Sequence, residues 1–456
     1  MAQKLSVLEA RAARAGFIGS VIEYYDYLVY AFLATVIAAN FFPDSSGAVG
    51  LLATLAIFGA GYVARPAGAV FFGWLGDRHG RKIALLSTVV LMGVATCLIG
   101  LIPTYATLGV GAPILLTLLR LMQGFGAGGE LIGATTYVAE SAHPSRRGFL
   151  LAMAPLGAGT GAAMAPAVVG LVNATASDDA LTEWAWRVPF LLSIPLLLLS
   201  LWLRIGLEDS PEFKKMVADS TIVRSPLVEV FRSHAPKLVL VIAVALAMNT
   251  ASFLATTYMN IYLTRDAGLP KATTYWLSAA VLALALCGYI IGGRLVDRIG
   301  TRKALLLGLS MCCILAFPTL SVIGSSDSLI VIGLVYAVYT IASNIALTPG
   351  YSAIFNAFPG PVRYSGSAFG FNIGAMIGSG FAPYLAGLLA TSTGRPTTPS
   401  LLVIGAAIIG ITAAIPLTSA RRAVAVSSSH TGGDEADSAH PPRDNGEPVP
   451  ASESRR

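Results

Sequence analysis

Apolar runs long enough to cross a lipid bilayer dominate the chain. A membrane-spanning helix needs about 20 largely apolar residues, and twelve segments of the 456-residue sequence meet this requirement. Charged residues make up only 12% of the chain, roughly half of their usual share in soluble proteins. The sequence therefore predicts an all-α membrane protein. The twelve expected spans are 17–41, 50–74, 84–102, 112–138, 149–173, 187–205, 237–263, 273–293, 304–323, 328–353, 365–390 and 399–419.

The distribution of basic residues predicts the orientation of the spans. If the N-terminus is cytoplasmic, the inside loops and termini hold 24 Lys and Arg residues and the outside loops hold 4. Because positive charge accumulates on the cytoplasmic side, we expect both termini there. The expected location is a plasma membrane of the bacterial inner-membrane type.

One long polar stretch divides the spans into two groups of six. We expect an N-terminal six-helix bundle over 1–205, a cytoplasmic central loop over 206–236 and a C-terminal six-helix bundle over 237–420. Residues 421–456 are rich in Ser, Pro, Gly, Asp and Glu. This composition predicts a disordered cytoplasmic tail.

Two loops repeat one short pattern at matching places in the two groups. Gly73–Lys82 reads GWLGDRHGRK after the second span, and Gly293–Lys303 reads GRLVDRIGTRK after the eighth, at an offset of 220 residues. Such a repeat predicts two pseudo-symmetric bundles. Each Asp can accept hydrogen bonds from the N-terminus of a neighbouring helix, and each Gly permits a tight turn. The residues expected to close the cytoplasmic side are Asp77, Arg78, Gly80, Arg81, Asp297, Arg298 and Arg302.

The repeated loop resembles the cytoplasmic signature loop of the major facilitator superfamily. Three further motifs, GSVIEYYD at Gly19–Asp26, RLMQGFGAGGE at Arg120–Glu130 and EDSPEF at Glu208–Phe213, are similar to those of its metabolite:proton symporter family. Members of that family carry shikimate, 2-oxoglutarate, citrate, proline and betaine. The resemblance implies the major facilitator fold, alternating access and proton-coupled symport, driven by the proton gradient without a cofactor. The family's coiled coil is absent, which weakens a betaine assignment.

Five ionisable residues lie well inside the expected spans, where they are costly and normally face a cavity and a partner. At 1.5 Å per residue, Asp26, Arg65 and Glu130 lie about 15, 13 and 12 Å from the cytoplasmic ends of their helices. Glu23 and Asp26 lie three residues apart on one helical face, so Arg65 is the expected partner of either acid. Arg65 also lies at a similar depth to Glu130. Because Glu23 is nearer the cytoplasmic end, pairing with loop cations alone is its alternative. The group forms either a static network or a proton pathway, and Asp26 and Glu130 are the predicted carriers. The predicted proton-coupling residues are Asp26, Glu130, Glu23 and Arg65.

The fifth buried charge, Arg120, predicts binding of an anion. Its guanidinium presents a planar fork that matches a carboxylate. A small organic acid is therefore the expected substrate, with a zwitterion such as proline or betaine as the alternative. The predicted substrate-binding residues are Arg120, Gln123, Tyr27, Tyr30, Asn249 and Asn372.

Other functional classes lack the residues that they need. The sequence has no G-x-x-x-x-G-K-[ST] phosphate loop, and its 5 histidines all fall in expected loops or in the tail. The 4 cysteines lie in apolar segments without ligand spacing. We therefore expect a lipid-embedded, monomeric transporter of a carboxylate and protons, with no enzymatic activity, metal site or nucleic-acid partner. An exporter, an antiporter or a membrane-embedded enzyme is less favoured.

Overall fold

The computed structural model describes residues 7–45, 47–143, 146–206, 208–219 and 225–430, and the regular elements within these ranges are all helical. Residues up to Thr418 form one compact unit, whose internal arrangement is described below. Residues 419–456 form a second unit, into which the last helix continues as far as His430. The rest of the predicted tail, 431–456, lies outside the described residues.

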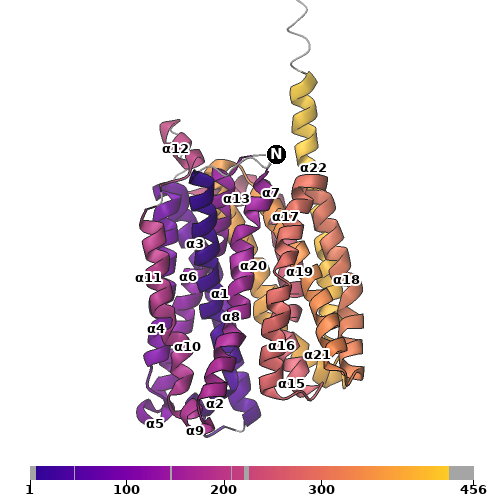
Figure 1. Cartoon of the computed structure of the whole chain (residues 1–456). Coiled ribbons are helices and arrows are strands. Elements are labelled where there is room, and N and C mark those ends of the chain that lie inside the picture. The colour runs from indigo at the N-terminus through magenta and orange to yellow at the C-terminus, as the bar shows by residue number, and fades with distance from the viewer. Residues whose placement is uncertain (1–6, 46, 144–145, 207, 220–224, 431–456) are drawn as a thin grey trace, which may run out of the picture. The chain divides into compact units, whose positions relative to one another are not determined.

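The first half of the chain folds into long helices that stand side by side (Figure 1). Each of its six predicted spans coincides with helix, and several helices extend beyond the apolar run into the flanking loops. Its elements are α1 (Val7–Phe32), α2 (Ala34–Phe41), α3 (Gly47–His79), α4 (Arg81–Leu101), α5 (Tyr105–Leu108), α6 (Gly111–Ser141), α7 (Arg147–Leu151), α8 (Met153–Thr175), α9 (Asp178–Glu183), η2 (Ala185–Arg187), α10 (Val188–Leu191) and α11 (Ser193–Ile205).

The central loop and the second half complete the helix order. The predicted loop contains two short helices, and the six later spans again coincide with helix. The elements are α12 (Pro211–Ala218), α13 (Pro226–Ser233), α14 (Ala235–Phe253), η3 (Leu254–Tyr258), α15 (Met259–Arg265), α16 (Lys271–Leu284), α17 (Cys287–Ile299), α18 (Thr301–Ser325), α19 (Leu329–Ala357), α20 (Gly360–Ala375), η4 (Met376–Phe381), α21 (Ala382–Thr393) and α22 (Ser400–His430).

The count of twelve spans is consistent with the structure. Within the described ranges, 9 stretches are long and apolar enough to cross a membrane, or up to 10 if the pair α1 and α2, bent by 60°, is one span. One of the 9 stretches, Lys271–Ser325, holds two of the predicted spans, and α6 is not among them.

Large apolar side chains point away from the helix bundle. Trp202 on α11 is 73% exposed, and Ile330 on α19 is 83% exposed. Similar exposed residues line α4 and α18, for example Leu98 and Ile314. Water would disfavour so much exposed apolar surface, whereas lipid tails accommodate it, so these faces suit a bilayer.

Glycines allow helix backbones to touch in the first half. A Cβ atom at Gly124 of α6 would lie 1.9 Å from the Gly61 carbonyl oxygen of α3, and one at Gly161 of α8 would lie 2.1 Å from the Val21 carbonyl oxygen of α1. Side chains at these positions would push the helices apart. Small residues supply close helix contact in this way in membrane proteins.

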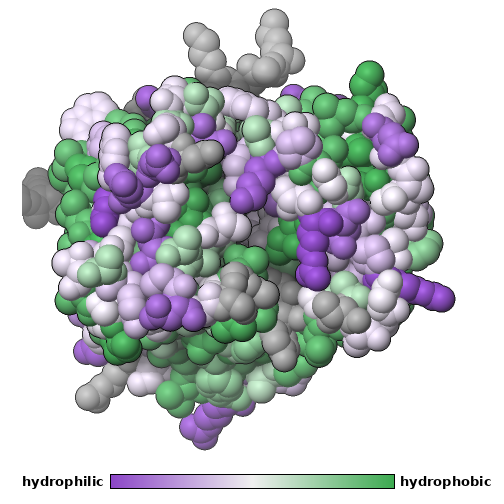
Figure 2. Space-filling model, turned by 90° about the horizontal axis from the view of Figure 1, so that it is seen from below, coloured by the Kyte–Doolittle hydropathy of each residue, from purple (hydrophilic) through white to green (hydrophobic). Residues whose placement is uncertain are grey.

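The two halves meet mainly through α20 against α3 and α16 against α8. We call the end of the unit that carries the repeated loops and α12 the signature-loop face (top of Figure 1). Hydrogen bonds join the halves close to this face, for example Tyr364 Oη to the Gly129 carbonyl at 2.6 Å. On the opposite face, Tyr275 Oη donates to the Phe32 carbonyl at 3.4 Å, and Figure 2 shows a hollow near the middle of that face.

Candidate functional site

Arg120 lies inside a cluster of aromatic rings in the first half. Its side chain is 0% exposed, and its guanidinium carbon is 4.2 Å from the ring centre of Tyr30, 4.4 Å from that of Tyr27 and 5.2 Å from that of Phe58. Cation–π attraction of this kind is strongest in desolvated surroundings. The rings hold the cation in place without neutralising it.

One edge of the Arg120 guanidinium is free. Nη1 donates to Gln123 Oε1, whose amide nitrogen in turn donates to Thr96 Oγ1 at 2.8 Å and to the Asp26 carbonyl at 3.2 Å. Nε and Nη2 of Arg120 are buried and have no hydrogen-bond partner among the described residues. These two donors form the edge that binds a carboxylate in bidentate fashion, so Arg120 is arranged to receive an anion.

Arg65 of α3 also lies against the ring of Tyr27, which Arg120 contacts as well. Its guanidinium carbon is 4.4 Å from the Tyr27 ring centre and 4.6 Å from that of Tyr62. Its acidic neighbour is Glu23, with Oε1 at 4.0 Å from Arg65 Nη2. Glu23 is 0% exposed, and neither of its carboxyl oxygens has a hydrogen-bond partner in the described part of the chain.

Two partners were predicted for Glu23 as alternatives, Arg65 and the loop cations. The carboxyl group is buried beside Arg65, and no loop cation pairs with it among the described residues. The prediction that Arg65 has an acidic partner on the first span is confirmed, and that partner is Glu23, whereas Asp26 forms no ion pair in the described part of the chain.

Asp26 has no cationic partner within the described residues. Ser193 Oγ of α11 donates to its Oδ1 at 2.5 Å, and its Oδ2 is buried without a hydrogen bond. Desolvation without a nearby cation favours the neutral form of a carboxyl group. Asp26 is connected to Arg120 by Gln123, which bonds to both residues.

Glu130 is fully paired, and its partner is not Arg65. Arg204 of α11 donates to both of its carboxyl oxygens, one of them at 3.0 Å, and Thr88 Oγ1 donates at 2.5 Å. A Cβ atom at Gly19 would lie 1.6 Å from Arg204 Nη2, so the glycine of the first-span motif makes room for the ion pair. Arg65 was predicted to lie at the depth of Glu130, but the ion-pair partner of Glu130 is Arg204 from the end of α11.

The two asparagines predicted to bind substrate donate their hydrogen bonds to backbone carbonyls. Asn372 of α20 donates to the Gly128 carbonyl of α6 at 2.7 Å, which ties the second half to the first about two turns from Arg120. The side-chain amide of Asn249 donates to the Ala245 carbonyl of its own helix. The backbone carbonyl of Asn249 accepts a hydrogen bond from Ser379 of η4 at 3.2 Å. Gln123, Tyr27 and Tyr30 are the predicted residues that the structure gathers around Arg120.

Asp77 connects the two halves at the signature-loop face. Its Oδ2 accepts hydrogen bonds from Ser365 of α20, from the backbone nitrogen at 2.9 Å and from Oγ at 2.7 Å. Its Oδ1 pairs with Arg81 at 2.5 Å, and Arg81 also pairs with Glu140 of α6 at 3.3 Å. The predicted contact of this Asp with the N-terminal part of a neighbouring helix is confirmed.

Asp297 makes the corresponding contact from the second half to the first. Its two carboxyl oxygens accept hydrogen bonds from the backbone nitrogens of Gly148 and Phe149 in α7, both at 2.9 Å. Each repeated loop therefore contacts a helix of the opposite half, and Asp297 caps α7. Gly80 and Gly300 have φ values of 109° and 82°, as the predicted tight turns require.

The remaining residues of the predicted gate lie at the surface. Arg78 is exposed, and its guanidinium carbon is 5.6 Å from the Trp74 ring centre. Arg298 is exposed at the end of α17, and Arg302 is exposed in the first turn of α18. None of the three joins the ion pairs around Asp77 that the described residues form.

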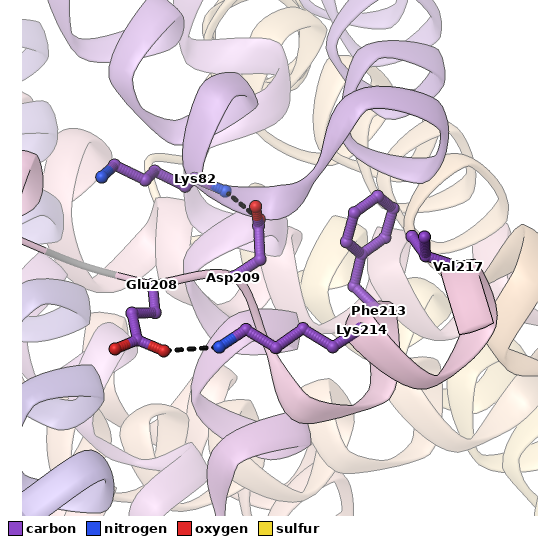
Figure 3. Close-up of a pocket in the computed structure, with 6 residues that line it drawn as sticks. All are labelled: Lys82, Glu208, Asp209, Phe213, Lys214 and Val217. Carbon is purple, nitrogen blue, oxygen red and sulfur yellow. Dashed lines mark hydrogen bonds and ion pairs between the residues drawn. The ribbon is translucent and has the colours of Figure 1, made fainter.

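The central loop adds contacts that the repeated motif did not reveal. Asp209 Oδ1 accepts from the Lys82 backbone nitrogen at 3.0 Å, beside a surface pocket that Figure 3 shows. Lys214 donates to Glu208 at the pocket rim, and this hydrogen bond lowers the pKa of Glu208. The lining residues are Lys82, Glu208, Asp209, Phe213, Lys214 and Val217.

Sequence reasoning missed Arg204, which it assigned to the cytoplasmic boundary. The available signal was weak: Ile205 continues the apolar run after it. It also missed the hydroxyl partners Thr88, Thr96 and Ser193, because single Ser and Thr residues are common in membrane helices. Among the described residues, no group of three or more His, Cys, Asp or Glu side chains is arranged to hold a metal ion.

Known proteins match this chain over most of its length. Residues 16–373 match the model of the Major Facilitator Superfamily. The shikimate transporter of Escherichia coli is 34% identical over 391 residues, which cover 85% of this chain and 89% of the relative. The proline/betaine transporter of Salmonella typhimurium is 33% identical over 419 residues, covering 89% and 83%.

A solved structure shares the fold. The proton:xylose symporter XylE bound to 6-bromo-6-deoxy-D-glucose superimposes with a TM-score of 0.72 at 16% identity, over 89% of this chain and 94% of that chain. An identity this low concerns the fold alone.

Proposed function

Because the chain belongs to the major facilitator superfamily and is a multi-pass membrane transporter of small molecules, not an enzyme, we propose that it carries a small organic acid together with protons by alternating access. The family match and the two relatives support transport itself. The substrate class and the coupling ion are proposed from the geometry of the site.

The free edge of Arg120 carries the proposal. A buried guanidinium with unsatisfied Nε and Nη2 donors is costly, and a carboxylate satisfies both donors in one plane. Tyr27, Tyr30 and Phe58 hold the guanidinium from its faces, so this edge remains available for the substrate.

Asp26 is the proposed proton carrier. Its carboxyl group is buried with a single hydrogen bond, so protonation costs it little. Gln123 links its backbone to Arg120, so a substrate that pulls on Arg120 also acts on α1 at Asp26. Glu23 beside Arg65 is the second candidate, whereas the pairing of Glu130 with Arg204 supports a structural role for that acid.

The proposed movement is between two six-helix bundles, 1–205 and 237–420, on either side of the central loop 206–236. Asp77 and Asp297 act as the gate, since each holds a helix end of the opposite bundle. We assign the signature-loop face to the cytoplasm of a bacterial-type plasma membrane, with both termini on that side. The proposed transporting unit is the monomer.

A zwitterion such as proline or betaine is the second candidate substrate. The name of the Salmonella typhimurium relative favours it, and its carboxylate would use the same Arg120 edge.

Arg120→Lys tests the proposal. Counterflow in proteoliposomes, run against a panel of organic acids and zwitterions, first identifies a transported compound. Arg120→Lys should then lose its uptake as fully as Arg120→Ala, because an ammonium group lacks the bidentate edge. Arg265→Gln, at an exposed arginine that ends α15, is the matched control and should transport normally. Unchanged affinity in the Lys variant would remove Arg120 from the substrate site.

A further inference from the structure

Four aromatic rings surround the two buried arginines of the site. Tyr27, Phe58 and Tyr62 pack against one another, with ring centres 5.0 to 5.6 Å apart, and Tyr30 stacks on Phe58 at 6.2 Å. An aromatic cluster of this kind commonly recognises a quaternary ammonium group through cation–π attraction.

In this cluster every ring already has a guanidinium beside it. Arg120 lies on Tyr27, Tyr30 and Phe58, and Arg65 lies on Tyr27 and Tyr62. Both guanidinium carbons are 4.4 Å from the Tyr27 ring centre, so they lie no more than twice that distance apart. A cationic group brought to these rings would therefore face two like charges in a desolvated space.

The local charges also favour an anion. Arg65 and Arg120 contribute two positive charges, and Glu23 beside Arg65 compensates at most one of them. Asp26, the remaining acid near Arg120, is neutral once it carries the proton. At least one positive charge is then left uncompensated, and such a charge is expensive to bury. A monoanion compensates it, whereas a zwitterion with no net charge does not.

We propose that the site selects carboxylates whose remainder carries no positive charge and rejects zwitterions such as proline and betaine. This inference rests on the proposed function, in which the free edge of Arg120 binds a carboxylate. The discrimination between neutral-tailed carboxylates and zwitterions arises from the net charge of Arg65, Arg120 and Glu23 and from the guanidinium groups on the aromatic rings.

Matched pairs of ligands test the inference on the purified full chain in lipid nanodiscs. Glycine betaine and 3,3-dimethylbutanoate have the same shape and the same carboxylate, and they differ only in whether the branched atom is charged nitrogen or neutral carbon. Proline and cyclopentanecarboxylate form a second pair. At about pH 7 all four carboxyl groups are ionised, so dissociation constants from ligand-induced thermal stabilisation compare the tails alone.

The neutral-tailed acid of a pair should bind at least about tenfold more tightly than its zwitterion. Equal or tighter binding of the zwitterions would overturn the inference, and so would failure of both neutral-tailed acids to bind. If betaine binds at least as tightly as 3,3-dimethylbutanoate and Arg120→Lys abolishes that binding, the carboxylate site stands and only the charge selection fails. If 3,3-dimethylbutanoate binds equally well to Arg120→Lys, the proposed function itself fails.

Variants of Arg65 separate charge from packing. Arg65→Gln removes one of the two cations and should reduce the preference for the neutral tail by about threefold or more. Arg65→Lys keeps the charge and should keep the preference, and Arg265→Gln should leave it unchanged. An unaltered preference in Arg65→Gln, together with normal binding of 3,3-dimethylbutanoate, would contradict the assignment to charge.

Discussion

The two halves of the chain repeat the same loop pattern but differ in the chemistry behind it. In the first half, Arg81 follows the turn and pairs with Asp77 at 2.5 Å and Glu140 at 3.3 Å. At the offset of 220 residues the corresponding position is Thr301, whose hydroxyl is 2.9 Å from that of Ser352. An ionic network in one half is thus replaced by a neutral hydroxyl pair in the other.

The same contrast continues inside the membrane. Among the described residues, the buried charged side chains lie in the first half, whereas the second half buries amides and hydroxyls that bond to backbone carbonyls. Asn344 donates to the Ala285 carbonyl at 2.9 Å, and Thr348 donates to the Tyr289 carbonyl at 3.1 Å. Neutral side chains whose hydrogen bonds are already made interact weakly with an incoming anion or proton, whereas charged side chains interact with both strongly. We infer that the first half binds the transported ions and the second half moves against it.

The largest effect should come from leaving a charge of the first half without its partner. Arg204→Met removes both hydrogen bonds to the Glu130 carboxylate and should destabilise the protein by about 3–5 kcal/mol. Thermal unfolding in detergent measures the loss. The double variant Arg204→Met, Glu130→Leu should recover much of the stability, because no charge is then stranded. A double variant as unstable as the single one would contradict a structural ion pair.

Of the two gate residues, Asp77 in the first half should matter more for the rate of transport than Asp297 in the second half. Asp77→Asn removes the charge that Arg81 faces as well as a strong acceptor for Ser365, so initial uptake should fall by about tenfold or more, with ligand affinity largely kept. Asp297→Asn keeps one acceptor for the α7 backbone nitrogens and should slow uptake only a few-fold. Initial uptake rates and ligand binding, measured on the same proteoliposomes, show whether each substitution slows transport or weakens binding. Equal slowing would mean that the ionic network adds nothing to gating.

The smallest effect should appear at the hydroxyl pair of the second half. Thr301→Val removes one neutral hydrogen bond with Ser352 and should cost about 0.5–1.5 kcal/mol, with transport close to normal. Thermal unfolding and uptake rates check both statements. A loss of transport as severe as that of Asp77→Asn would show that the second loop is as critical as the first.

Sequence patterns located the helices well because each span must be apolar over its whole length. They also located Asp26, Arg65, Arg120 and Glu130, since ionisable residues are conspicuous in such segments. They failed on partners. Depth along separate helices says nothing about how each helix is rotated, so the sequence could not decide whether Arg65 pairs with Glu23 or with Asp26, and it did not reveal Arg204 as the partner of Glu130. The pairing of Glu130 with Arg204 depends on α11 packing against α4 and α1, which only the three-dimensional structure reveals.

The aromatic enclosure of Arg120 was also beyond the sequence. Tyr27 and Tyr30 are among the predicted binding residues, whereas Phe58 and Tyr62 of the second span carry no sequence signal that sets them apart from other aromatic residues of the chain. The contact of Phe58 with Arg120 requires α3 and α6 to approach closely, and the glycines Gly61 and Gly124 permit that approach.

Neutralisation of Asp26 separates proton coupling from anion binding, both of which we propose for the first half of the chain. Asp26→Asn should keep substrate exchange in counterflow, since Arg120 and its rings remain, and should lose accumulation driven by a pH gradient. Asp44→Asn, at an exposed loop acid, is the matched control and should keep both activities. If Asp26→Asn still accumulates substrate when only a proton gradient is supplied, Asp26 is not the carrier and the proposed coupling is wrong.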